Sequence, residues 1–207
     1  ATGTTFAPTN GLWRSNDGTA TNWSQITTFG GNNIRDLALV AFDSDVLWLG
    51  ETDGTLRRST NATDAAPTFT PITVTGAPSN ASVSEVAINP LNPDDVVVVY
   101  RGLCGNQCNN ADNRMRRVFR TLDAGDNWAD ISGTDGNPVG NLPNLPTHSV
   151  VFDIGTSPVS IIVSNDAGVL RSSNDGQTWE RLGLGLPTAD SKMLQIDDSV
   201  EPPVLRL

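Results

Sequence analysis

The stretch that decides the fold is Val169-Leu170-Arg171-Ser172-Ser173-Asn174-Asp175-Gly176-Gln177-Thr178-Trp179-Glu180-Arg181-Leu182. Gly176 reaches, at low cost, the backbone conformations that a tight antiparallel hairpin needs. The Ser, Asn and Thr side chains of the turn can bond backbone N–H groups, which closes a polar loop without orphan donors. Trp179 then carries a large apolar area away from the turn. The stretch therefore predicts a strand, a polar turn and a returning strand that enters a core.

The same turn recurs along the chain. Its form, Ser-x-Asn-x-Gly-x-Thr-Trp, returns as Thr121-x-Asp123-x-Gly125-x-Asn127-Trp128. A looser copy runs from Trp13 to Gly18 with Trp23 arriving late, and an eroded copy runs from Leu56 to Asn61 with Phe69 in place of the tryptophan. We interpret the arginines of these strands as equivalent, namely Arg14, Arg57, Arg120 and Arg171. Their unequal spacing predicts β-propeller blades that carry loops of different length.

Apolar runs between the turns predict the remaining strands. Ile34–Phe42 and Val96–Tyr100 are typical of strands that are buried on both faces. No window predicts an amphipathic helix, and residues 1–10 are predicted to be a connector. The predicted strands group as two, four, four, four and two, which amounts to about four blades of four-stranded antiparallel sheet.

The recurring turn resembles the Asp-box, or BNR repeat, which decorates β-propellers. Proteins with this repeat include sialidases, xyloglucan-active endoglucanases, sortilin-type receptors and a photosystem II assembly factor. The resemblance implies an all-β propeller whose Asp-box turns lie on the face opposite the active site. These families share the turn and not the chemistry, so the resemblance implies a fold and leaves the activity open.

The ends of the predicted strand order allow three arrangements. The chain is a segment of a larger ring of roughly six to eight blades, a closed four-blade ring, or one half of an eight-bladed pair of copies. In the closed ring, Gly11–Ile26 and Met193–Leu207 join as one blade and leave no exposed sheet edge. In every case residues 1–207 form a single propeller domain or a propeller segment.

Composition excludes several classes of protein. The 207 residues carry a formal net charge of -10, which argues against a nucleic-acid groove because phosphate binding needs a basic surface. No run approaches the roughly 18 apolar residues of a membrane-spanning helix. Lys192 is the only lysine among the cationic residues. The remaining partners are a protein, a glycan, further blades of a longer chain or a second copy of this one.

One face of the predicted propeller gathers the long loops, and we call it the loop face. Loops between second and third strands, together with loops between blades, ring a central funnel that commonly binds ligands. The first kind is predicted at Glu51–Gly54, Arg101–Arg116 and Asn165–Gly168. The second kind is predicted at Gly30–Asn33, Gly76–Ser82, Gly133–His148 and Gly183–Lys192.

The loop Arg101–Arg116 carries a basic cluster in an acidic chain. Its candidate ligand-binding residues are Tyr100, Arg101, Arg114 and Arg116, because guanidinium groups bind carboxylate or sulfate. A solvated loop whose charges match nearby acids explains the same residues. Cys104 and Cys108 form a poor zinc site and predict a small disulfide that pins the loop. Such a disulfide implies an oxidising compartment, extracellular or periplasmic.

Catalytic candidates are weaker. Glycoside hydrolysis by paired carboxylates needs two acids at roughly 5–10 Å, and the acids of the loop face are Glu51, Asp53, Asp112 and Asp166. The chain lacks a recognisable sialidase arginine context, a nucleophile elbow and a phosphate loop. His148 is interpreted as a loop or core histidine. The turn Asn92–Asp95 is a candidate for structural calcium, although Asx-turn hydrogen bonds explain it without an ion; no other metal or cofactor is predicted.

These observations favour a non-enzymatic binding or structural module that contacts protein or glycan through the loop face. The alternative is a glycoside hydrolase, or part of one, that acts on a polysaccharide. An assembly factor that docks onto a larger complex is a third hypothesis.

Overall fold

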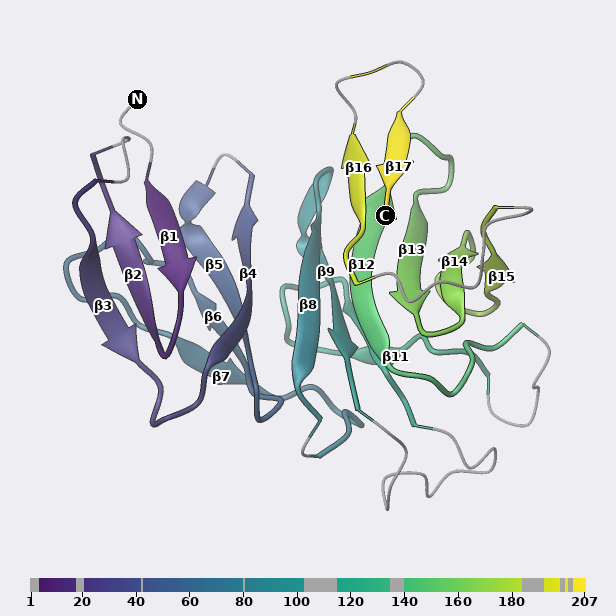
Figure 1. Ribbon diagram of the computed structural model, residues 1–207, viewed down its shortest axis with the longest axis horizontal. Helices are drawn as coiled ribbons and strands as arrows, with labels where there is room; N and C mark the ends of the chain where they lie inside the picture. Colours follow the sequence, from purple (N-terminus) through teal and green to yellow (C-terminus); the bar gives the residue numbers. More distant parts are fainter. Residues whose placement is uncertain are drawn as a thin grey trace.

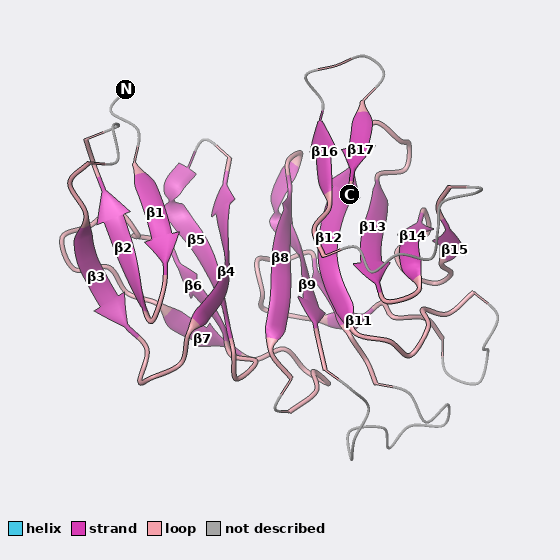
Figure 2. Cartoon of the chain, in the orientation of Figure 1, coloured by secondary structure: helices cyan, strands magenta, loops and turns pink. Residues whose placement is uncertain are grey.

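The computed structural model describes residues 4–17, 21–41, 43–79, 81–102, 115–134, 140–183, 192–197, 200 and 203–207. The described residues contain strands, turns and no helix (Figure 2). Each strand pairs with its neighbour in antiparallel order, because the polar turns and short loops return the chain beside the strand just made. The all-β prediction is therefore confirmed.

The strands form five sheets (Figure 1). The first contains β1 (Thr5–Pro8), β2 (Gly11–Ser15) and β3 (Ser24–Thr28). The second contains β4 (Ile34–Val40), β5 (Asp43–Glu51), β6 (Leu56–Ser59) and β7 (Thr70–Ile72). The third contains β8 (Val83–Asn89), β9 (Asn92–Tyr100), β10 (Val118–Thr121) and β11 (Ala129–Asp130). The fourth contains β12 (Thr147–Asp153), β13 (Ser160–Asn165), β14 (Gly168–Ser172) and β15 (Glu180–Arg181), and the fifth contains β16 (Gln195–Asp197) and β17 (Val204–Arg206).

The sheets stand side by side as successive blades of a propeller. The first strands of neighbouring sheets contact each other, β4 with β8, β8 with β12, and β12 with β16. These four strands form the inner wall, and the later strands of each sheet lie outward (Figure 1). The core consists of apolar layers between the sheets, such as the layer that joins Val97 and Val99 of the third sheet to Val163 and Leu170 of the fourth. The chain thus folds as a partial propeller.

The first sheet corrects one sequence prediction. Residues 5–8, expected to be part of a connector, form β1 and pair with β2, so that Phe6 lies opposite Arg14. The alternation of Thr, Phe, Ala and Pro gave little strand signal, because Pro8 cannot donate to a ladder. β2 carries the polar turn at its end, as β6, β10 and β14 do, so β1 occupies the place of a second blade strand.

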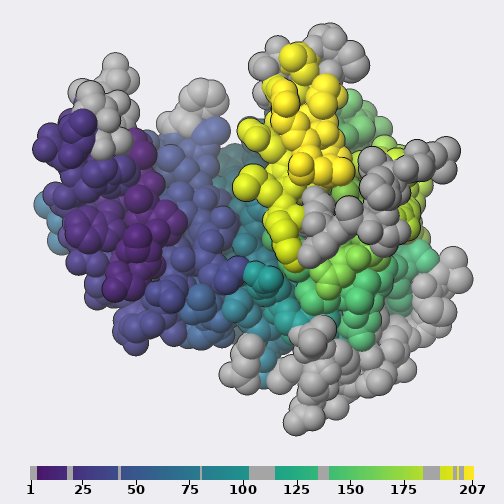
Figure 3. Space-filling view, in the orientation of Figure 1, coloured from purple at the N-terminus to yellow at the C-terminus, as the bar shows by residue number. Residues whose placement is uncertain are grey.

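The two end sheets stay separate. Among the described residues, β16 and β17 pair only with each other, and β1, β2 and β3 form their own sheet. Figure 3 shows a hollow between the N-terminal sheets and the yellow C-terminal strands. The described part of the chain therefore does not show the closed four-blade ring that the sequence allowed.

All four polar turns share one hydrogen-bond pattern. In the fourth sheet, Ser172 Oγ donates to Asn174 Oδ1 at 3.0 Å, and that oxygen accepts the backbone N–H of Thr178 at 3.0 Å. In the third sheet, the Asp123 carboxylate accepts the hydroxyl of Thr121 and the backbone N–H of Asn127 in the same way. An Asx side chain thus closes each loop just before an aromatic residue, and in the fourth sheet that residue, Trp179, is buried in the core.

The looser and eroded copies keep this pattern over longer loops. Asp17 accepts the backbone N–H of Asn22 at 3.1 Å, and Asn61 accepts that of Thr68 at 2.9 Å. The next residues, Trp23 and Phe69, therefore occupy the place of Trp179. The register also corrects the predicted arginine series, because Arg58 and not Arg57 precedes the turn hydroxyl of the second sheet.

Side chains of each inner strand bind the edge of the next one. Asp36 Oδ2 of β4 accepts the backbone N–H of Val86 at 2.7 Å, and Glu85 Oε2 of β8 accepts that of Val150 at 2.9 Å. Ser149 Oγ of β12 accepts the backbone N–H of Leu194, which precedes β16, at 2.9 Å. Burial raises the pKa of Asp36, and burial raises the pKa of Glu85 to about 7 against the effect of hydrogen bonds from Ser149 and Val150. These contacts join the sheets without a continuous ladder.

Candidate functional site

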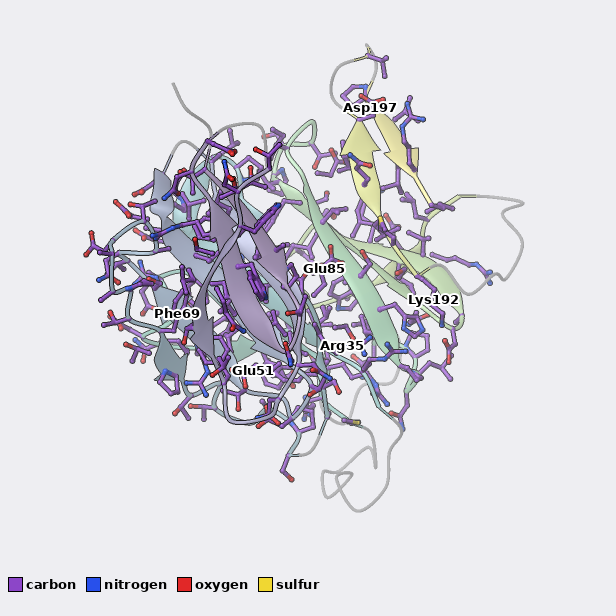
Figure 4. All side chains as sticks on the ribbon, turned by 60° about the vertical axis from the view of Figure 1, so that its left-hand side comes forward. Arg35, Glu51, Phe69, Glu85, Lys192 and Asp197 are labelled. Atoms are coloured by element: carbon purple, nitrogen blue, oxygen red, sulfur yellow. The ribbon has the colours of Figure 1, made fainter. Side chains whose placement is uncertain are left out.

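The loop face is the end of the molecule where the inner strands begin and the second strands end. Three of the four inner strands, β4, β8 and β12, have a register irregularity there, between Ile34 and Asp36, between Val83 and Glu85, and between Thr147 and Ser149. The polar turns of the four-stranded sheets follow the third strand and lie at the opposite end of the molecule from the loop face, as predicted. In Figure 4 the labelled Arg35 and Glu51 lie toward the lower, loop-face end and Asp197 lies at the upper end.

Glu51 and Asp53 form one cluster on this face. The Glu51 carboxylate is fully buried and ion-paired with Arg57. Asn32 Nδ2 contacts both carboxylates, at 3.3 Å from Glu51 Oε2 and 2.5 Å from Asp53 Oδ2. Burial raises the pKa of Asp53, but hydrogen bonds from Thr55 and Asn32 outweigh burial and lower the pKa overall. The Asp53 carboxylate is therefore held as an anion, which suits binding or structure better than proton donation.

The predicted ligand-binding residues do not meet at one point. Tyr100 is only 1% exposed and packs edge-on against Phe119 in the core, so its ring faces inward. Arg116 is ion-paired with Asp130. Arg101 is half-buried, and its backbone N–H binds the carbonyl of Ser82. Arg114, Asp112, Cys104 and Cys108 lie outside the described residues.

A second cluster joins the third and fourth sheets, and we call it the junction cluster: Arg117, His148, Asn165, Asp166 and Lys192. His148 Nε2 lies 2.6 Å from Asp166 Oδ1 and 3.3 Å from Lys192 Nζ. The His148 side chain is 5% exposed and that of Asp166 is 40% exposed, so the pair links the interior to the surface. Asp166 was a catalytic candidate from the sequence, whereas His148 was interpreted as a loop or core histidine.

Arg117 and Asn165 bring buried donors to the same cluster. Arg117 is 2% exposed, donates to the carbonyl of Gly102 at 2.6 Å and to Asn144 Oδ1 at 3.3 Å, and lies within charge range of Asp166. Asn165 is fully buried, and its Oδ1 accepts the backbone N–H of Ala167 at 2.8 Å. Arg117 Nε and Asn165 Nδ2 have no hydrogen-bond partner among the described residues.

Metal and cofactor ligands are scarce in the part of the chain that the structure describes. No group of three or more His, Cys, Asp or Glu side chains has the spacing of a metal site there. In the candidate calcium turn, Asn92 Oδ1 accepts the backbone N–H of Asp94, and Asp95 binds Arg120. Asx hydrogen bonds and ion pairing thus account for these oxygens. No helix that could cross a membrane occurs among the described residues.

A groove opens along the inner wall, away from both clusters. It has a volume of about 280 Å³ and lies between β8 and β12, with Ile196 of β16 at its side. Its lining is mainly apolar, with Val86, Ile88 and Val151 among the residues, and Glu85 supplies its one carboxyl group.

Comparison with known proteins defines the fold. No family model matches the chain, and no curated protein matches it. An ancestral GH74 enzyme is similar in structure, with a TM-score of 0.62 and 17% identity over 88% of this chain and 22% of the enzyme. A chain of a nidogen/laminin complex gives a TM-score of 0.62 and 15% identity over 94% of this chain and 65% of the other.

A GH74 enzyme from Niastella koreensis gives a TM-score of 0.60 and 22% identity, over 86% of this chain and 27% of the enzyme. The chain thus spans between about a fifth and two thirds of the length of these structures. At such low identity the likeness establishes the β-propeller fold and leaves the activity open.

Proposed function

We propose that the chain is a non-enzymatic, extracellular propeller module, or a segment of one, that binds a protein or glycan through its loop face. One observation carries the proposal. In the described part of this face the candidate carboxylates are engaged, Glu51 with Arg57 and Asp166 with His148, whereas Arg117 and Asn165 keep unpartnered donors. A site that keeps unpartnered buried donors and fixes its acids is suited to recognition.

The finer assignments rest on the same grounds. We propose that the four polar turns are Asp boxes, because they share one hydrogen-bond pattern. We also propose that Cys104 and Cys108 form a disulfide in an oxidising compartment. Support for extracellular binding comes from the neighbours, which include a protein of a nidogen/laminin complex and the extracellular domain of a putative one-component system from B. thetaiotaomicron at a TM-score of 0.55.

A binding screen with variants of both faces tests the proposal. Glycan arrays and pull-downs should yield a ligand for the whole chain, and Asp166→Ala should weaken it. Gln177→Ala, on the face of the polar turns, should leave the same binding unchanged. Loss of binding from changes on the polar-turn face alone would overturn the assignment of the loop face.

Glycoside hydrolysis is the second candidate. It is favoured by the structural neighbours, which include GH74 enzymes, and by the contact of Glu51 and Asp53 with one amide, that of Asn32. If the chain hydrolyses a polysaccharide, single replacement of Glu51, Asp53, Asp112 or Asp166 by Ala should abolish turnover at one of them. If hydrolysis persists in all four variants, none of these four residues is catalytic.

A further inference from the structure

The junction cluster contains a buried cation whose charge the fold does not neutralise directly. Arg117 has its guanidinium between two sheets, bonded to a carbonyl and an amide oxygen. No carboxylate of the described residues forms an ion pair with it, and Asp166 acts on it only through space. Burial lowers the pKa of Arg117 to about 10, so the group stays charged at neutral pH. A buried charge without an ionic partner is costly, which makes such a residue a signal of function.

Asn165 supplies a second unsatisfied donor in the junction cluster. The residue ends β13, where β5 has Glu51 and β9 has Tyr100. Glu51 is satisfied by Arg57 and Asn32, and Tyr100 packs in the core. Only in the fourth sheet does this position present a buried amide N–H₂ without a partner among the described residues. Buried polar groups are normally paired, so the donor requires an explanation.

At the surface of the junction cluster, Lys192 adds a second positive charge to that of Arg117. Lys192 is exposed and reaches the His148 ring, which contacts Asp166. Three groups therefore offer positive charge or N–H donors at the junction, and one carboxylate offers an acceptor. Because the whole chain carries a net charge of -10, this local polarity is opposite to its surroundings.

We infer that the junction cluster is a subsite for the carboxylate of a hexuronate residue in an acidic polysaccharide. The carboxylate accepts from Arg117 and Asn165 with Lys192 at the rim, and Asp166 accepts a sugar hydroxyl. Asp166 favours a sugar acid over an acidic peptide, because a uronate carries hydroxyl donors beside its carboxylate and an acidic side chain carries none. The inference deepens the proposed function and rests on its glycan arm.

Calorimetric titration with trigalacturonate tests this assignment, and its methyl ester, which has the same ring but no charge, is the control ligand. The whole chain should bind the acid at least tenfold more tightly than the ester, and binding should weaken as salt is raised. Lys192→Gln and Asn165→Asp should each lower affinity at least tenfold. Asn165→Asp keeps the acceptor for Ala167 but replaces the donor by a repelling oxygen. Arg171→Gln, the same loss of charge at the outer pair with Glu180, should leave affinity unchanged.

Arg117→Met gives a readout that does not depend on affinity alone. Without ligand, its thermal midpoint should stay close to that of the parent chain, because removal of the uncompensated charge offsets the loss of the hydrogen bonds to Gly102 and Asn144. The midpoint increase that trigalacturonate causes in the parent should be absent. A lower ligand-free midpoint would show that Arg117 is satisfied within the fold and would count against the subsite.

The remaining outcomes are equally decisive. Equal binding of acid and ester, no binding of either, or insensitivity to Lys192→Gln and Asn165→Asp would overturn the hexuronate subsite. Tighter binding of triglutamate than of trigalacturonate would replace the sugar by an acidic peptide. If another ligand from the screen binds the loop face and ignores these substitutions, the proposed function stands and only this inference fails.

Discussion

Trp179 of the fourth sheet donates its indole N–H to the backbone carbonyl of Ile131, which follows the third sheet, at 2.8 Å. The ring is 5% exposed and packs with Val118, Leu142 and Leu170 between the two sheets. Trp179 therefore follows the polar turn of its own sheet and also contacts the preceding blade through this hydrogen bond and its ring packing. The equivalent Trp128 packs edge-on against Trp48 of the second sheet but stays half-buried.

Trp179→Ala should lower the free energy of unfolding by roughly 3–5 kcal/mol, because it removes a large buried ring and an interblade hydrogen bond. Gln177→Ala, at an exposed position of the same turn, should change it by less than roughly 0.5 kcal/mol. Denaturant unfolding of both variants measures the difference. Equal midpoints would show that the turn does not deliver Trp179 to a core.

Glu85 should make stability depend on pH. Its pKa of about 7 exceeds the ordinary value of 4.5, so the folded chain holds a proton that the unfolded chain releases. The stability contributed by this group is fully present below pH 4.5 and is lost as the pH rises to about 7. Glu85→Gln keeps an acceptor for Val150 and should be more stable than the parent at pH 8 by roughly 2–3 kcal/mol, with little difference at pH 4.

Thermal melts across this range, with Glu180→Gln as the exposed control, decide the point. The control should follow the parent at every pH, because Glu180 lies in a surface pair. A constant offset between Glu85→Gln and the parent would mean that folding does not shift the pKa of Glu85.

The Glu51–Arg57 pair should matter more than an exposed pair of the same chemistry. Arg57→Met leaves a fully buried carboxylate without its cation and should cost about 3 kcal/mol. Arg171→Met, whose partner Glu180 is 63% exposed, should cost less than about 1 kcal/mol. Urea unfolding compares them, and adding Glu51→Gln to Arg57→Met should recover part of the loss. Similar costs for both arginines would contradict the burial of the pair.

Gly125 should tolerate no side chain. Its φ of 100° lies in the left-handed region, and an added Cβ would come within 2.8 Å of the Trp48 ring. Gly125→Ala should therefore destabilise the chain by roughly 1–3 kcal/mol. Gly155→Ala is the matched control, because the nearest contact of its added Cβ is the end of the Asp153 side chain, at 3.2 Å. A Gly125→Ala midpoint equal to that of the control would show that the turn relaxes freely.

Sequence reasoning succeeded where the chemistry was local. The polar turns follow from residues within ten positions of each other, such as Ser172 and Asn174, whereas the face on which they lie was implied by the resemblance to a known repeat. The junction cluster was missed because Arg117, His148 and Lys192 are far apart in sequence and meet only when two sheets pack. One signal could have been read from the sequence. His148 precedes Ser149 in β12 as Ser84 precedes Glu85 in β8, so the two residues occupy equivalent positions near the start of an inner strand.

The links between inner strands have a direction. In each, an acceptor side chain belongs to one blade and a backbone N–H belongs to the next, and Asp, Glu and Ser fill the acceptor role in turn at Asp36, Glu85 and Ser149. In each of these links the donor is thus a backbone N–H, which any residue except proline supplies. A blade can change most of its residues, or be copied and inserted, and still dock onto its neighbour. Links of this kind allow the blade arrangement to persist while the sequences of the blades diverge.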